Sequence, residues 1–199
     1  MIYDDSFLKN HTTDEPITDG ETDSWVRSHG GNKNLKFSKF DQINSKNIKN
    51  LKLLWKYESF PKENSDSTWI DNVELNPIFV NGILYSVTSD RRIIAINASD
   101  GKEIWSIQAL DRPATRGLVF FQNTSKNKPA LFIPIGNRIY KIDALTGKLI
   151  KTFGGAGFVS RIISKIAPVI YKNELFAIGI SPPRVVRYDI LTGEKKSEI

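Results

Sequence analysis

Short apolar runs separated by polar turns fill the chain from about residue 77 onward. Between residues 77 and 106 the runs are PIFV, ILYSVT, IIAIN and KEIWS, and the turns between them are NG, SDRR and ASDG. These runs lack the three- and four-residue spacing of a helix, and short runs bounded by Gly, Asn and Asp are typical of strands. Asn-Gly and Asp-Gly accept the positive φ of tight hairpins, so the segment predicts a meander of four antiparallel strands.

The turn before the fourth run recurs at a fixed interval. NASDG at 97–101 is followed by DALTG at 143–147 and DILTG at 189–193, so successive copies lie 46 residues apart. The second copy contains GLVFF, ALFIPI, RIYKID and KLIKTF, and the third contains APVIY, ELFAIGI and RVVRYD before a weak fourth strand. A four-stranded unit with a period of about 40 to 50 residues is the sequence form of a β-propeller blade. Sandwiches and barrels do not require turns at a constant period, so we predict an all-β propeller fold.

The repeats number about three and a half, and a propeller ring typically needs ~4 to 8 blades to close. The sequence therefore predicts an incomplete propeller over residues 25–199, either the N-terminal part of a longer one or a chain that pairs with another chain, because open sheet edges invite aggregation. The lead-in, residues 1–24, is acidic and polar and predicts a flexible arm. The repeats lie at about 70–107, 116–154 and 163–199, with a half repeat at 43–58.

Composition excludes several classes of protein. The 199 residues, 40% of them hydrophobic, can bury a core, and the apolar runs are far shorter than the roughly 20 residues of a membrane-spanning helix. The absence of cysteine excludes disulfides, thiolate metal sites and a cysteine nucleophile. The net charge of +6 comes from scattered Lys and Arg, which does not indicate a nucleic-acid partner. No basic segment precedes an apolar stretch at the N-terminus, so no secretion signal is expected in this chain.

Five segments carry a resemblance to a known family. They are WVRSHGGN with the FS, DQIN, NI and LKLLW that follow it, ELNP, RGLVFF, LFIPIGNRIYKIDALTGKLIKTFGGAG, and APV. In this order they resemble the pyrroloquinoline-quinone-dependent (PQQ-dependent) dehydrogenases, which are quinoprotein glucose and alcohol dehydrogenases with eight-bladed propellers. The segments cover most of residues 25–193. None is decisive alone, but the ordered set is specific.

The resemblance implies the N-terminal portion of a periplasmic dehydrogenase that oxidises a sugar or an alcohol and passes electrons to a quinone or a cytochrome. The cofactor would be PQQ, with a calcium ion polarising its reactive carbonyl. Glu74 and Arg116 match residues of the family that contact the cofactor. A guanidinium can bind a carboxylate through two hydrogen bonds, and a carboxylate can accept one from a ring N–H. Lys165 stands where relatives carry a Thr that bonds the cofactor.

Other functional residues of the family have no counterpart here. Its catalytic Asp and an Asn metal ligand belong to later blades, so catalytic residues are expected beyond residue 199 and calcium ligands in blades that are not present. Alcohol-oxidising relatives carry a calcium-binding Glu where this chain reads GISPP at 179–183. The chain alone is expected to be inactive, and any membrane association would come through segments outside it. The alternatives are a non-catalytic scaffold that binds proteins, of the outer-membrane-assembly type, and a degenerate fragment without activity.

Three further features bear on packing and ligands. The family docks its blades through a Trp four residues after the turn glycine, and the equivalent positions here are Trp105, Lys151 and Ser197. Loss of two indoles predicts weaker packing of the later blades.

GGAG at 154–157 follows a strand but opens no helix, so it is interpreted as a turn rather than a phosphate-binding loop. Two lone histidines, His11 and His29, lack partners at metal-ligand spacing, so zinc binding is not expected.

Overall fold

The structure, a computed structural model, is built from strands. It describes residues 24–32, 36–38, 40–59, 73–122, 128–162, 165–180 and 182–198. Within these ranges, twelve strands form three four-stranded antiparallel sheets. The described ranges contain no α-helix, and their helical turns are short 3-10 segments at Ser28–Gly30, Ile48–Asn50 and Phe153–Gly155. The predicted all-β class is therefore confirmed.

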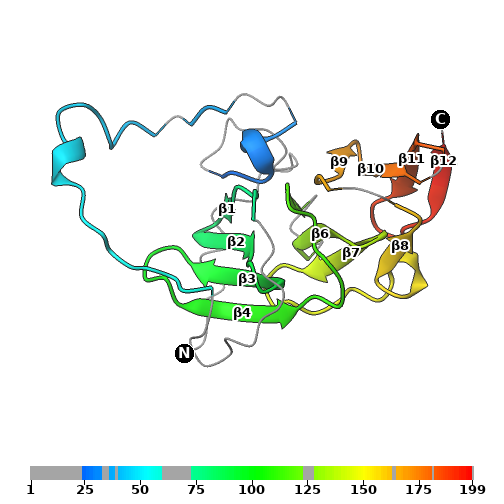
Figure 1. Cartoon of the computed structure of the whole chain (residues 1–199). Helices are drawn as coiled ribbons and strands as arrows, with labels where there is room; N and C mark the ends of the chain where they lie inside the picture. The colour runs from blue at the N-terminus through cyan, green and yellow to red at the C-terminus, as the bar shows by residue number, and fades with distance from the viewer. Residues whose placement is uncertain are drawn as a thin grey trace.

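Each sheet is one blade, and its strands pair in sequence order. The three sheets follow one another from green through yellow to red in Figure 1. The first blade consists of β1 (Ile78–Val80), β2 (Ile83–Val87), β3 (Arg92–Asn97) and β4 (Glu103–Gln108). The second consists of β5 (Val119–Phe121), β6 (Ala130–Ile135), β7 (Arg138–Asp143) and β8 (Phe158–Ser160). The third consists of β9 (Val169–Tyr171), β10 (Glu174–Gly179), β11 (Arg184–Asp189) and β12 (Lys195–Glu198).

The recurring turn has the same geometry in every blade. Gly101, Gly147 and Gly193 have φ angles of 73°, 70° and 75°, a region that side chains with a Cβ avoid. Each glycine N–H donates to the backbone oxygen four residues earlier, over 2.8, 2.9 and 2.9 Å. In the later two copies the carboxylates of Asp143 and Asp189 also accept from backbone N–H groups of the turn. The predicted equivalence of the three turns is confirmed.

The fourth strand of the second blade differs from the prediction. KLIKTF was expected to form it, but only Leu149 makes an isolated bridge there, to Ile142. The chain then turns at Phe153–Gly155, where the glycines of GGAG take φ angles of 61°, 74° and 85°. An extended strand cannot continue through such angles, so β8 begins only at Phe158. The interpretation of GGAG as a turn is confirmed, and the placement of the strand at 148–153 is wrong.

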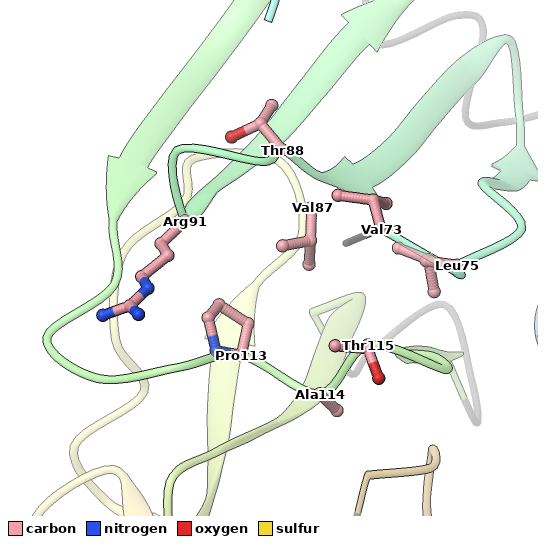
Figure 2. Close-up of a pocket in the computed structure, with 8 residues that line it drawn as sticks. All are labelled: Val73, Leu75, Val87, Thr88, Arg91, Pro113, Ala114 and Thr115. Carbon is pink, nitrogen blue, oxygen red and sulfur yellow. The ribbon is translucent and has the colours of Figure 1, made fainter. Parts of the chain in front are cut away.

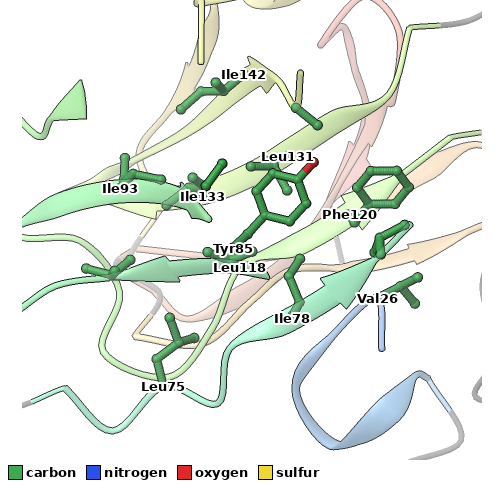
Figure 3. Packing of buried hydrophobic residues seen from close by; sticks show 14 of the residues in the cluster. Val26, Leu75, Ile78, Tyr85, Ile93, Leu118, Phe120, Leu131, Ile133 and Ile142 are labelled. Carbon is green, nitrogen blue, oxygen red and sulfur yellow. The ribbon is translucent and has the colours of Figure 1, made fainter. Parts of the chain in front are cut away.

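Apolar side chains fill the spaces between neighbouring sheets. In the first space the ring of Tyr85 lies 6.1 Å from that of Trp105. It also lies 6.3 Å from the ring of Phe120, and Figure 3 shows these two rings among the buried side chains. In the second space Phe132 and Phe153 meet edge to face with centroids 5.4 Å apart. Every residue of β6 is buried, because the second blade has a sheet on both of its faces. This explains the unbroken apolar run ALFIPI.

A segment ahead of the blades joins all three. Residues 25–32, which we call the strap, run across the first strands of the blades (dark blue in Figure 1). Trp25 forms an antiparallel bridge with β1, and Arg27 forms one with β5. Nδ2 of Asn32 donates to the backbone oxygen of Ile170 in β9 over 2.6 Å. One short segment thus ties three separate sheets together.

Indole rings cover the first two of the recurring turns. Nε1 of Trp105 donates to the oxygen of Ala144 over 2.9 Å, and a Cβ on Gly147 would come within 2.9 Å of the ring. Trp55, which precedes the first blade, makes the same 2.9 Å bond to that blade's turn and lies on Gly101. The docking role predicted for Trp105 is confirmed, and most of its side chain is buried against the core between the first two blades. The same role of Trp55 was not predicted.

The third turn is covered without an indole. Phe153 is fully buried beside it, and the N–H of Gly154 donates to the oxygen of Thr192 over 2.7 Å. A Cβ on Gly193 would come within 2.6 Å of that nitrogen. The two blades are therefore in close contact, and the weaker packing predicted from the loss of a Trp at Lys151 is wrong for this pair. Phe153, two residues after Lys151, fills the space between the second and third blades that an indole would occupy.

Candidate functional site

The loops that lead into the first strand of each blade approach one another at the same end of the sheets. Glu74 lies four residues before β1, Arg116 three residues before β5, and Lys165 four residues before β9. Because the blades repeat the same strand order, equivalent loops emerge on the same face. The structure therefore brings the sequence-predicted residues to one face of adjacent blades.

Glu74 and Arg116 contact each other directly. Nε of Arg116 donates to Oε2 of Glu74 over 2.8 Å, although the residues are 42 positions apart. The side chain of Glu74 is 51% exposed, and that of Arg116 is 63% exposed. An ion pair this exposed contributes only about 0 to 1 kcal/mol of stability. The pair is thus accessible to a ligand and is a minor contributor to the stability of the fold.

The backbone of Arg116 is fixed more firmly than its side chain. Its N–H donates to the oxygen of Lys165 over 3.0 Å, and its oxygen accepts from Oγ of Ser28 in the strap over 3.2 Å. A parallel bridge to Ile166 adds a second link to the third blade. At Gly117, with φ of 143°, a Cβ would come within 2.8 Å of the Ser28 hydroxyl. The strap and the third blade therefore hold the base of the exposed guanidinium.

Arg27 of the strap holds the loop that carries Lys165. Its Nε and Nη2 donate to the backbone oxygens of Pro168 and Ala167 over 3.3 and 3.2 Å. Burial lowers the pKa of this guanidinium, but arginine remains charged throughout the ordinary pH range. The sequence pattern did not indicate this role, because a single arginine that contacts residues 140 positions away leaves no local signal.

A small pocket lies between the first two blades, lined by sequence neighbours of both Glu74 and Arg116. Figure 2 shows its apolar side chains turned toward one another, with the guanidinium of Arg91 extending away from Val73 and Leu75. The last two flank Glu74, and Thr115 precedes Arg116, so the pocket joins the two loops that carry the pair. Its lining consists of Val73, Leu75, Val87, Thr88, Arg91, Pro113, Ala114 and Thr115. We interpret it as support for these loops.

The described residues offer no metal centre. No group of three or more His, Cys, Asp or Glu side chains among them could hold an ion. His29 is exposed in the strap with φ of 68°. The other candidate, His11, and the acidic arm up to residue 23 lie outside the described residues. The part of the chain that the structure describes also contains no helix long and apolar enough to cross a membrane.

Three successive four-stranded sheets, of which the first two each dock on the glycine turn of the next sheet, define part of a β-propeller. Residues 25–198 match the sequence profile of the glucose/ethanol/alcohol dehydrogenase β-propeller domain, also designated PQQ. The chain belongs to this family.

Individual relatives share modest sequence identity with the chain. The dehydrogenase subunit of alcohol dehydrogenase (quinone) from Gluconobacter oxydans (strain 621H) is 28% identical over 141 residues, which cover 66% of this chain and 17% of that protein. Quinoprotein glucose dehydrogenase from Escherichia coli (strain K12) is 27% identical over 163 residues, which cover 73% of this chain and 20% of that protein. The chain thus spans 17% to 20% of the length of these relatives.

Solved structures share the fold. Quinohemoprotein alcohol dehydrogenase from Comamonas testosteroni aligns with a TM-score of 0.68 at 21% identity, over 98% of this chain and 29% of that one. A europium-containing methanol dehydrogenase aligns with a TM-score of 0.62 at 19% identity, over 98% and 33% of the two chains. At these identities the likeness establishes the fold.

Proposed function

We propose that this chain forms part of a PQQ-dependent dehydrogenase that oxidises a sugar or an alcohol in the periplasm and passes the electrons to a quinone or a cytochrome. Membership of the dehydrogenase family supports the general activity. The observation that carries the assignment of a site is the contact between Glu74 and Arg116, which join loops of adjacent blades at one face. The substrate class, the electron acceptor and the compartment are inferred from the family alone.

Glu74 and Arg116 would hold one edge of the cofactor, which is a planar tricarboxylate. Glu74 engages Nε of Arg116 and so orients the guanidinium plane, and a guanidinium can bind a carboxylate bidentately. The exposure of both side chains fits a group that arrives from solvent. Lys165, whose backbone is bonded to that of Arg116, would add a second positive charge for the same ligand.

The chemistry of the bound cofactor is to accept the two electrons of the substrate. Residues of this chain contribute binding and orientation, because the described residues include no base at the site other than Glu74 and no ligand set for calcium. The catalytic base and the calcium ligands are therefore assigned to parts of the polypeptide outside these residues. Arg27 and Ser28 position the loops that carry the contacts.

Calorimetric titration of the complete protein with PQQ, with and without calcium, tests the proposal. Binding should depend on calcium, and Arg116→Ala should weaken it by about 1.5 to 3 kcal/mol, the usual contribution of a hydrogen bond to a charged group. Lys102→Ala is the matched control, because it removes one exposed positive charge from the turn at the opposite end of the first blade. If the complete protein fails to bind PQQ, a non-catalytic scaffold becomes the better explanation; if it binds PQQ but both variants bind alike, Arg116 is not a cofactor contact.

A further inference from the structure

At the contact between the second and third blades, a lysine occupies the place of an indole. Nζ of Lys141, in β7, donates to the oxygen of Ile190 over 2.8 Å and lies 3.5 Å from that of Leu191. Between the first and second blades, the equivalent oxygen belongs to Ala144 and accepts from Nε1 of Trp105 over 2.9 Å. Both oxygens belong to the residue directly after the Asp that opens the turn. The amine therefore makes the inter-blade bond that the indole makes elsewhere.

The amine lies in an apolar setting. Lys141 is 6% exposed, and its Nζ lies 5.5 Å from the ring centroids of both Phe132 and Phe153. Nζ contacts backbone oxygens, and no salt bridge joins it to a carboxylate of the described residues. Desolvation lowers the pKa of Lys141 to about 8, against an opposing attraction from Asp189. An indole remains neutral at every pH, whereas this amine gains and loses a proton.

Three other charged side chains face this contact or act on it. Asp189 ends β11, and its pKa is lowered chiefly by backbone hydrogen bonds within its own turn. Asp143, two residues along β7 from the lysine, likewise accepts backbone hydrogen bonds of its turn. Lys196 of β12 pairs with Glu194 over 3.0 Å, and its pKa is raised chiefly by that bond. The lowered pKa of Lys141 makes the charge of this amine change between about pH 7 and pH 9.

We propose that the contact between the second and third blades is proton-sensitive: it closes most tightly around the neutral amine of Lys141 and loosens when that amine is protonated. When the contact opens, the amine enters water, where a lysine pKa is about 10.4. The closed state therefore loses its proton first as the pH rises. The closed contact should gain stability between about pH 8 and pH 10.4, with no further change outside this window. At the contact between the first and second blades the donor is the indole of Trp105, which does not titrate, so the stability of that contact should not change over this pH window.

Two measurements on the full chain test this inference. In an NMR titration of ¹³Cε-labelled lysine, one resonance should titrate near pH 8 and should disappear in Lys141→Met. In urea unfolding, the equilibrium constant for unfolding of the wild type should fall by up to about 100-fold between pH 7 and pH 10 relative to that of Lys141→Met. Lys148→Met, which removes an exposed lysine beside the preceding turn, is the control and should keep the wild-type pH dependence.

Lys141→Arg adds a charge that persists across the range and should unfold more readily than the wild type at pH 10. If Lys141→Met fails to fold, assignment of the pH 8 resonance in wild type and Lys148→Met still decides the question. The inference is overturned if every lysine resonance titrates above pH 10. It is equally overturned if wild type and Lys141→Met share the same pH dependence of unfolding.

Discussion

Removal of the Trp105 ring tests how strongly one blade depends on the next. A fully buried Trp→Ala change costs about 3 to 5 kcal/mol, and because this ring keeps some exposure to solvent we expect about 2 to 3 kcal/mol from lost packing against Tyr85 and Gly147. The substitution also leaves the oxygen of Ala144, a fully buried residue, without its 2.9 Å donor, which adds about 1 kcal/mol. Trp105→Ala should therefore lower the free energy of unfolding by about 3 to 4 kcal/mol.

Urea denaturation followed by circular dichroism measures this change. Trp105→Phe should recover most of the packing but not the hydrogen bond, and Leu110→Ala, at a residue that is 92% exposed, should change stability by less than about 0.5 kcal/mol. Gly147→Ala strains a φ of 70° and brings a Cβ within 2.9 Å of the indole. Its cost should therefore be smaller when Trp105 is already Ala. Strictly additive losses in the double variant, or a Trp105→Ala loss below about 1 kcal/mol, would refute this account of docking.

Two further predictions concern the strap. Gly117→Ala should destabilise the chain by about 1 to 3 kcal/mol, because a Cβ would come within 2.8 Å of the Ser28 hydroxyl, and Gly117→Ala combined with Ser28→Gly should recover part of the loss in thermal unfolding. Arg27→Met should increase amide hydrogen exchange in β9 while leaving β2 and β3 unchanged, because Arg27 bonds the oxygens of Pro168 and Ala167 just before β9. Equal exchange in wild type and variant would contradict the strap's hold on the third blade.

The sequence predicted the blades because their turns depend on local chemistry. An Asx residue followed four positions later by a glycine specifies the same turn wherever it occurs, so Gly101, Gly147 and Gly193 were found at equivalent places. The fourth strand of the second blade was misplaced because apolar character alone does not reveal where the glycines after Phe153 end a strand. Hydrophobic pattern thus located the sheets more reliably than their boundaries.

The contacts between blades were only partly predictable. Trp105 was recognised from its position, but the third turn is covered by Phe153 and Lys141, which come from two different positions along the second blade. Phe153 fills the space beside the turn and Lys141 donates to the backbone oxygen, whereas Trp105 does both at the preceding turn. No single position in the second blade therefore carries a recognisable docking residue. The proximity of Glu74 and Arg116 followed from a family resemblance and from the blade repeat, whereas the supporting role of Arg27 depends on distant contacts that no local pattern encodes.

The strap also imposes an order on folding. Each blade is a local meander and can form soon after its own residues leave the ribosome, but Asn32 must wait for Ile170, which is synthesised 138 residues later. At the usual rates of translation this delay is roughly 10 s. During that interval the bridges of Trp25 with β1 and of Arg27 with β5 can form, but Asn32 still lacks its partner in β9. Contacts of such long sequence separation form late, so consolidation of the strap should be a slow phase of refolding that follows the formation of the individual sheets.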